Sequence, residues 1–383
     1  MKKLFAIFAA LCMVSMSACF SSWDGSGDQG NIVINLGNSG ARAVGLPGGG
    51  GSQTAAQKAP VKYTVILTNS GETSISQTTS GGTVGFSVQP GNWHVLVRAD
   101  SNGTLSGYGE TDVEVRAGAT SDALVTVGGR PTIGDVEITE VVSAWTDLKK
   151  ALEKATGDQQ EYVLLTRNLR VNSSIEISSG GNITLLAKDR ITITKGDVVQ
   201  NSLFRVIWGS SLTLGAEEEM PGTITVDGCG YKPRNSSLFY VGNATVFNAT
   251  PPDVGPSGGT LAMYEGVTLT NNYATLGDRG GAVVVQGGTF TMHGGTISGN
   301  TAPYGGGVRI LSGNFIQIGG TIYGSGEGSK SNKATNSQKR GHAVYGAYTA
   351  PGSNSTTTKF QNTTSTGRLS LDNGHFEGSW ESN

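Results

Sequence analysis

The chain has 383 residues, of which 36% are apolar and 15% are charged, with 59 glycines and a formal net charge of -2. The apolar content excludes wholesale disorder, and abundant glycine without a Gly-X-Y triplet excludes collagen. The near-neutral charge gives no reason to expect nucleic acid as a partner. The length favours two domains, and the Gly, Ser, Thr and β-branched residues favour many short strands.

The N-terminus is typical of a secretory signal. Lys2 and Lys3 form a positive start, and an apolar stretch follows over residues 4–14. This stretch is too short to be a stable membrane span. We therefore expect residues 1–18 to be a signal peptide that is removed from the mature protein.

The residues at the expected cleavage point, Met-Ser-Ala-Cys over 16–19, resemble a bacterial lipobox. This resemblance implies that the thiol of Cys19 carries a diacylglyceryl group and that residues 19–30 form a flexible tether. The protein would then be anchored in the cell envelope, at the outer membrane or the cell surface. The alternative is ordinary cleavage near Ala18 with an incidental cysteine.

The remaining cysteine and the histidines do not form a recognisable reactive site. Once the signal is removed and Cys19 carries lipid, only Cys229 is left, and one thiol cannot form an intrachain disulfide. We expect Cys229 to be a half-buried filler rather than a nucleophile. One cysteine and four dispersed histidines do not make a metal site, so neither a metal nor a cofactor is expected.

Residues 31–130 predict a small antiparallel β-sandwich, because short runs alternate apolar and polar residues and Pro90-Gly91 marks a turn. The expected strands cover residues 31–36, 61–68, 83–89, 93–99, 111–116 and 122–127. The phrases over 86–93 and 113–118 resemble the transthyretin-like or carboxypeptidase-regulatory-like sandwiches of bacterial surface proteins.

A helix over about 146–156 follows. Its apolar side chains fall at helical spacing on one stripe: Leu148, Ala151, Leu152 and Ala155. Thr146 is the expected N-cap, Asp147 suits the positive helix start, and Gly157 can end the helix. We expect the helix to cover the open end of the strand array that follows, where a sheet edge would otherwise be exposed. The alternative is a simple connector.

From about residue 160 the sequence repeats itself. One phrase begins with glycine and reaches a small polar residue five positions later. Its copies begin at Gly222, Gly266, Gly295, Gly320 and Gly367. The shortest interval, from Gly295 to Gly320, is 25 residues.

Two further phrases recur along the chain at intervals that match those of the first. One contains Phe204, Phe239, Val283, Val308 and Val344, and the other covers residues 211–214, 289–292 and 314–317. A minimal coil therefore holds three short strands. A single coil cannot bury its apolar side chains, but coils stacked about 4.8 Å apart complete each other's hydrogen bonds and share a core. The sequence predicts an all-β protein in which residues 140–383 form a right-handed parallel β-helix.

The small polar residue at the end of the glycine phrase predicts a polar ladder. Asp227, Asn271 and Asn300 would lie one above another and bond to backbone groups of the turns. The alternative is a row of solvated turn residues.

The repeats resemble those of a known family. Gly280-Gly281-Ala282-Val283, with Leu-Thr-Asn-Asn over 269–272 and Ile-Ser-Gly-Asn over 297–300, resembles the GGAI and FxxN repeats of chlamydial polymorphic outer-membrane proteins. The chain also resembles β-helical surface lipoproteins of spirochaetes and gut anaerobes. The likeness covers about 258–325 and implies a β-helix with a surface role.

Parallel β-helices include the pectate lyases, which need clustered acidic residues for Ca²⁺ and a basic residue nearby. Alternation places one row of side chains outward, with positions held by Arg205, Tyr240, Val284, Arg309 and Tyr345. This row contains no Asp or Glu, so no catalytic residue is expected. Arg205, Tyr240, Arg309 and Tyr345 instead form a candidate binding strip; the alternative is a solvated face.

We therefore expect a non-enzymatic envelope lipoprotein that presents its β-helix as an adhesion or binding surface. Its partners would be the membrane, through the N-terminal lipid, and a glycan or a host or cell-surface protein. The alternative from another class is a polysaccharide lyase or glycoside hydrolase that acts on an extracellular glycan.

Overall fold

The computed structural model describes residues 29–36, 60–69, 74–157, 159–178, 180–199, 201–217, 220–231, 236–243, 258–275, 280–335, 340–348, 358–363, 368–372 and 375–377. The expected signal peptide and Cys19 lie outside the described residues. The described part is all-β apart from one α-helix and one 3-10 turn, as the composition predicts. No helix within this part is both long and apolar enough to cross a membrane.

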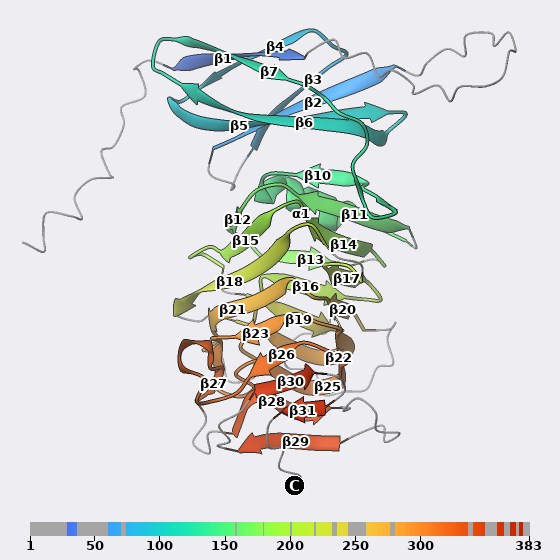
Figure 1. Ribbon diagram of the computed structural model, residues 1–383, viewed down its shortest axis with the longest axis vertical. Helices are drawn as coiled ribbons and strands as arrows, with labels where there is room; N and C mark the ends of the chain where they lie inside the picture. Colours follow the sequence, from blue (N-terminus) through green and yellow to red (C-terminus); the bar gives the residue numbers. More distant parts are fainter. Residues whose placement is uncertain are drawn as a thin grey trace, which may run out of the picture.

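Two sheets make up the N-terminal part (Figure 1). The first contains β1 (Gly30–Leu36), β4 (Thr83–Val88) and β7 (Thr120–Val125). The second contains β2 (Val61–Thr68), β3 (Ser74–Thr79), β5 (Gly91–Ser101) and β6 (Thr104–Val115). Side chains such as Ile34 and Phe86 from the first sheet share a buried core with Val65 and Val97 from the second. This facing arrangement agrees with the expected sandwich.

Two details of this part differ from the expectation. β1 and β7 pair in parallel, because both begin at the same edge, where Asn31 donates to the carbonyl of Ala119. β3 was not expected as a strand, since its Ser, Gln and Thr residues are largely exposed and lack an apolar alternation. An edge strand of this kind has a weak signal in the sequence.

A short hairpin of β8 (Thr132–Ile133) and β9 (Val136–Glu137) leads to β10 (Glu140–Val142) and α1 (Trp145–Lys154). The expected N-cap, Thr146, is wrong: the helix begins at Trp145 after Ala144, which makes no side-chain cap. The start lies earlier because Trp145, 7% exposed, joins the buried stripe of Leu148 and Leu152. This stripe packs into the core at the start of the strand array, as expected for a covering helix.

The rest of the chain forms three rows of strands, which together we call the parallel stack. Along the chain a strand of the first row is followed by one of the second row and then one of the third, and this order repeats. The first row contains β11 (Gln160–Leu165), β14 (Asn182–Ala187), β17 (Ser211–Leu214), β20 (Thr260–Met263) and the second halves of β22 (Val283–Met292) and β25 (Val308–Gln317). The second row contains β12 (Leu169–Val171), β15 (Arg190–Lys195), β18 (Thr223–Tyr231), β21 (Val267–Tyr273), β23 (Thr296–Ser298) and β26 (Thr321–Tyr323). The third row contains β13 (Ile175–Ile177), β16 (Phe204–Ile207), β19 (Phe239–Gly242), the first halves of β22 and β25, and β28 (Arg340–Tyr348).

Short elements lie beside the second row. β24 (Thr301–Ala302) pairs with β27 (Lys333–Ala334), and the 3-10 turn Gly328–Lys330 lies between β26 and β27.

The register of the third row agrees with the repeat. Val283 pairs with Val308, and Val308 with Val344, so these three residues are stacked neighbours as expected. Aromatic side chains stack in the same way: the ring centroids of Phe204 and Phe239 are 5.1 Å apart. One continuous buried cluster runs through the stack, because each layer covers the apolar side chains of the previous one.

The end of the chain departs from the expected pattern. β29 (Thr358–Thr363) is antiparallel to β28, and β30 (Arg368–Asp372) is antiparallel to both β26 and β31 (His375–Glu377). The phrase that begins at Gly367 was expected to be a further copy of the repeat, and this expectation is wrong. Alternation along a strand specifies which side chains share a face but carries no information on strand direction.

The N-terminal part and the parallel stack share a second apolar cluster. Ile66 and Leu96 lie on the face of β2 and β5 that points away from the first sheet, and they pack with Val141, Leu164 and Leu186 of the stack. All five side chains are at most 4% exposed. This contact joins the two parts through buried apolar surface rather than through a polar linker.

Candidate functional site

The candidate binding strip lies in one row, as expected, but it is not an open surface. Arg205 pairs with Tyr240, and Arg309 pairs with Tyr345, with Val284 between the two pairs. However, Tyr240 is only 3% exposed and Arg309 only 9%. The expectation of an exposed strip is therefore wrong for these two side chains.

Both covered side chains make contacts within the protein. The hydroxyl of Tyr240 donates to the carbonyl of Asn243, at 2.9 Å. The guanidinium of Arg309 lies 4.7 Å from the ring centroid of Tyr304 and 5.8 Å from that of Tyr345. These contacts stabilise the fold rather than leave donors for a ligand, because a cation against aromatic faces is already satisfied in part.

The row also contains a carboxylate that the sequence reading missed. Glu176 of β13 is the register partner of Arg205, and their side chains form a 2.7 Å hydrogen bond. The β13 strand is only three residues long and was not matched to the repeat, so its position in the row was not recognised. Because Glu176 is bound to Arg205, it adds an ion pair and not an acidic cluster.

The expected ladder of Asp227, Asn271 and Asn300 is divided: Asn271 bonds to Asp227, but neither belongs to the buried column that contains Asn300. Asn300 stacks with Asn272 and Asn332. Its side-chain Oδ1 accepts from the backbone N–H of Asn272 at 3.1 Å, and its backbone N–H donates to Oδ1 of Asn332 at 2.9 Å. All three asparagines are at most 1% exposed. Asp227 and Asn271 instead contact each other outside the core.

The difference has a local cause. Asn271 adopts a left-handed backbone conformation with a φ of 56°, and the register of β18 and β21 shifts just after Asp227. Because Leu269 pairs with Ile297, the position that matches Asn300 is Asn272, which is buried. Cys229 lies in the same bulge, half-buried as expected, with its amide bonded to Asp227 Oδ1 at 2.7 Å.

The ladder begins with a lysine. Lys195 is 2% exposed, and its Nζ donates to the carbonyl of Ser236 at 3.1 Å. Nδ2 of Asn272 donates to the same carbonyl at 2.9 Å. Buried backbone carbonyls of the turns therefore accept hydrogen bonds from side chains of neighbouring layers, because a buried carbonyl needs a partner.

The largest cavity that we describe lies where the N-terminal sheets meet the parallel stack. It has a volume of about 720 Å³, within the range of about 300–1,000 Å³ that is usual for ligand sites. We call it the junction cleft. The N-terminal sheets contribute Asn69, Asn92 and Trp93 to its lining, and the stack contributes Asp189 and Arg190.

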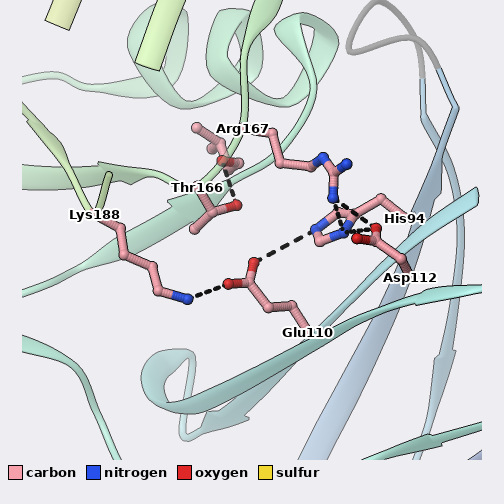
Figure 2. A network of polar contacts seen from close by, with 7 residues as sticks. His94, Glu110, Asp112, Thr166, Arg167 and Lys188 are labelled. Carbon is pink, nitrogen blue, oxygen red and sulfur yellow. Dashed lines mark hydrogen bonds and ion pairs between the residues drawn. The ribbon is translucent and has the colours of Figure 1, made fainter. Parts of the chain in front are cut away.

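A polar network lines the inner end of the junction cleft (Figure 2). His94 is 5% exposed, although it carries a titratable ring. Nη1 of Arg167, from the turn after β11, lies 2.8 Å from His94 Nδ1 and 2.6 Å from Asp112 Oδ1. Arg167 is thus held by two side chains of the N-terminal sheets.

The contacts of the His94 ring allow two tautomers. Nδ1 lies 3.0 Å from Asp112 Oδ1 and 2.8 Å from Nη1 of Arg167, so it either donates to the carboxylate or accepts from the guanidinium. Nε2 lies 3.5 Å from Oε2 of Glu110.

Glu110 is the second carboxylate at the junction, and it forms an ion pair with Lys188 of the stack. Burial raises the pKa of Glu110, but contacts with His94 and Lys188 outweigh it and lower the pKa to about 2. The hydrogen bond to Glu110 in turn raises the pKa of Lys188. Both groups therefore stay charged at neutral pH.

The polar side chains at the cleft bond mainly to one another and to the backbone. The hydroxyl of Thr166, which also lines the cleft, donates to the carbonyl of Val142. Within the described residues, no group of three His, Cys, Asp or Glu side chains could hold a metal ion. The sequence reading missed this site because Trp93 and His94 were interpreted only as strand residues.

We compared the chain with known proteins. No protein-family model, no curated protein and no solved structure matches it.

Proposed function

We propose that the protein is a non-enzymatic envelope lipoprotein, anchored through lipid on Cys19, that presents a binding surface on a right-handed parallel β-helix over residues 140–383. The lipid holds the chain at the outer membrane or the cell surface, since two or more acyl chains make a durable anchor. The partner is a glycan or a protein of another surface.

The β-helix is supported by the order and register of the strands. Each layer of the parallel stack contributes one strand to each row, and the layers repeat from β11 to β28. The stacked rings of Phe290 and Phe315, 5.0 Å apart, and the ladder of Asn272, Asn300 and Asn332 lie inside the three rows. Such columns are expected where every turn has the same shape.

One observation carries the presenting role: the N-terminal part and the stack share a buried apolar contact, from which we expect one stiff arm. The apolar cluster around Leu96 and Leu164 is shared by both, and ion pairs surround it. The pairs that cross the junction are Arg98 with Glu140, Asp112 with Arg167, and Glu110 with Lys188. A stiff arm holds a binding surface at a fixed distance from its membrane anchor, whereas a flexible linker would let it collapse.

A polysaccharide lyase or hydrolase remains the alternative from another class. Its test is incubation of the purified chain with a panel of polyuronides and neutral glycans, with and without Ca²⁺. Reproducible cleavage that is lost when one acidic residue is replaced would establish the enzyme and reject the non-enzymatic proposal.

The anchored, displayed state is tested in intact cells. We expect the native chain to incorporate labelled fatty acid and to be digested when intact cells are treated with protease. The Cys19→Ala variant should lose the label and leave the membrane fraction. If the variant stays with the membrane, or if the native chain is protected from protease in intact cells, the proposal fails. Cys229→Ala is the matched control and should behave as the native chain.

A further inference from the structure

We infer that the junction cleft is the ligand site of this protein and that its ligand is an uncharged oligosaccharide. This inference rests on the proposed binding role, and it names the site and the ligand class. The site differs from the candidate binding strip, whose central side chains are covered.

The walls of the junction cleft carry the polar groups that sugar hydroxyls need. Asn69 and Asn92 are exposed on one wall, and Asn168 is exposed on the other. An amide offers a donor and an acceptor in one plane, and neighbouring hydroxyls of a sugar ring present the same pair. Oδ1 of Asn168 accepts from the backbone amide of Thr192 at 2.7 Å, which orients this side chain.

An aromatic residue holds the rim of the cleft in place. Trp93 lines the cleft beside Asn92, packs partly against the buried core of the N-terminal sheets, and donates from Nε1 to the carbonyl of Gln89 at 2.8 Å. This packing and this bond fix the strand that carries Asn92 before any ligand binds.

The charges of the cleft favour a ligand without net charge. Arg167 is already paired with Asp112 inside the cleft. The exposed charges that remain on the stack side are one of each sign, Asp189 and Arg190. A uronate or a phosphate would gain one cation but meet one carboxylate at the same place, whereas hydroxyls can bond to both.

The contacts at the junction determine the spacing between the two walls of the cleft. Its two walls come from different parts of the chain, so the spacing between Asn92 and Arg190 depends on the ion pairs of Figure 2. Because Arg167, Asp112, Glu110 and Lys188 are bound to one another or to His94, the site is formed before the ligand arrives. Pre-formed sites bind without a large ordering cost.

The test is calorimetric titration of the purified full chain with a panel of short neutral gluco-, galacto-, manno- and chito-oligosaccharides, with oligogalacturonate and mixed tripeptides as competing classes. We expect one neutral series to bind. Asn92→Ala and Arg190→Ala should each weaken that binding about five- to tenfold, the worth of one hydrogen bond. Asn314→Ala and Arg116→Ala, which replace exposed residues elsewhere, should leave it unchanged.

Each other outcome overturns the inference. These outcomes are no binding across the neutral panel, tighter binding of oligogalacturonate or peptide, or neutral binding that the two cleft variants do not weaken. Thermal unfolding of each variant confirms that it is folded, and Trp93→Phe, which keeps an apolar ring, provides a second, milder change at the site. The Cys19→Ala experiment does not depend on these results, so loss of the cleft inference and loss of the anchored, displayed role are distinguishable.

Discussion

Oδ1 of Asn300 accepts a hydrogen bond from the backbone amide of Asn272, which lies one layer earlier in the parallel stack, at 3.1 Å. Nδ2 of the same side chain donates to the carbonyls of Leu269 and Ser298. One buried amide therefore satisfies backbone groups on two successive layers, so that its loss leaves several buried groups without partners.

The first prediction concerns this ladder. Asn300→Ala should lower the free energy of unfolding by about 2–4 kcal/mol, because buried donors and acceptors lose their partner. Asn271→Gly is the control: the φ of Asn271 is 56°, which glycine adopts without strain, and its side chain lies outside the core. Urea unfolding followed by circular dichroism measures both. Equal effects of the two changes would contradict the assignment of the ladder.

The second prediction is a pH dependence that originates at Glu110. Its pKa is lowered from 4.5 to about 2 in the folded protein, so ionised Glu110 stabilises the fold above its unfolded pKa. That stabilisation, about 2–3 kcal/mol, should disappear as the pH falls from about 4.5 to about 2. Glu110→Gln should remove this part of the pH profile.

Glu114→Gln provides the comparison for this experiment, since Glu114 lies on the same strand with a side chain 63% exposed. Thermal unfolding across the acid range should give the native profile for Glu114→Gln. A profile of Glu110→Gln that stays as steep as the native one would show that other carboxylates cause the acid sensitivity.

The third prediction concerns the shared core of the junction. Leu96 is fully buried, and Leu96→Ala should cost about 2–4 kcal/mol through the cavity that it leaves. Hydrogen exchange should then speed up in β11 and β14 of the stack as well as in β5, because both sides pack on this residue. Leu124→Ala, at a side chain 67% exposed, should change neither. Faster exchange in β5 alone would mean that the two parts are independent.

The fourth prediction separates two arginines of the same row. Arg309→Gln should destabilise the protein by about 2 kcal/mol, since Arg309 is 9% exposed and packs against two tyrosine rings. Arg205→Gln should cost about 0.5 kcal/mol, because its ion pair with Glu176 is partly solvated. Chemical denaturation of the two variants measures the difference. A larger loss of stability for Arg205→Gln than for Arg309→Gln would contradict the assignment of Arg309 as the more buried and more stabilising arginine.

The sequence predicts the rows of the stack well where apolar residues repeat. The stacking of Val283, Val308 and Val344 follows from the sequence because a buried column takes apolar side chains in every layer. The Leu-x-x-Asn spacing from Leu269 to Asn272 matches Ile297 to Asn300, and it contains the true ladder member. Counting from Gly266 instead selected Asn271, because Gly266 lies one position earlier in the register than Gly295, as the pairing of Thr268 with Thr296 shows.

The junction cleft could not be predicted in the same way. His94 and Asp112 lie on one hairpin of the N-terminal sheets, and Arg167 follows a strand of the stack. Nothing in the alternation of either segment specifies how two separately folded faces dock. The burial of Tyr240 could not be predicted for a related reason. A strand pattern distinguishes the two faces of a sheet, but it does not show what packs against the outer face.

The antiparallel strands at the C-terminal end have a consequence for self-association. A parallel array ends in free amide and carbonyl groups that suit the first layer of another copy, the arrangement by which fibrils grow. Here β29 follows β28 and β30 follows β26 in the opposite direction, and α1 packs at the other end. Both ends of the parallel array are therefore covered, so a second copy does not meet a bare layer on which it could continue the stack.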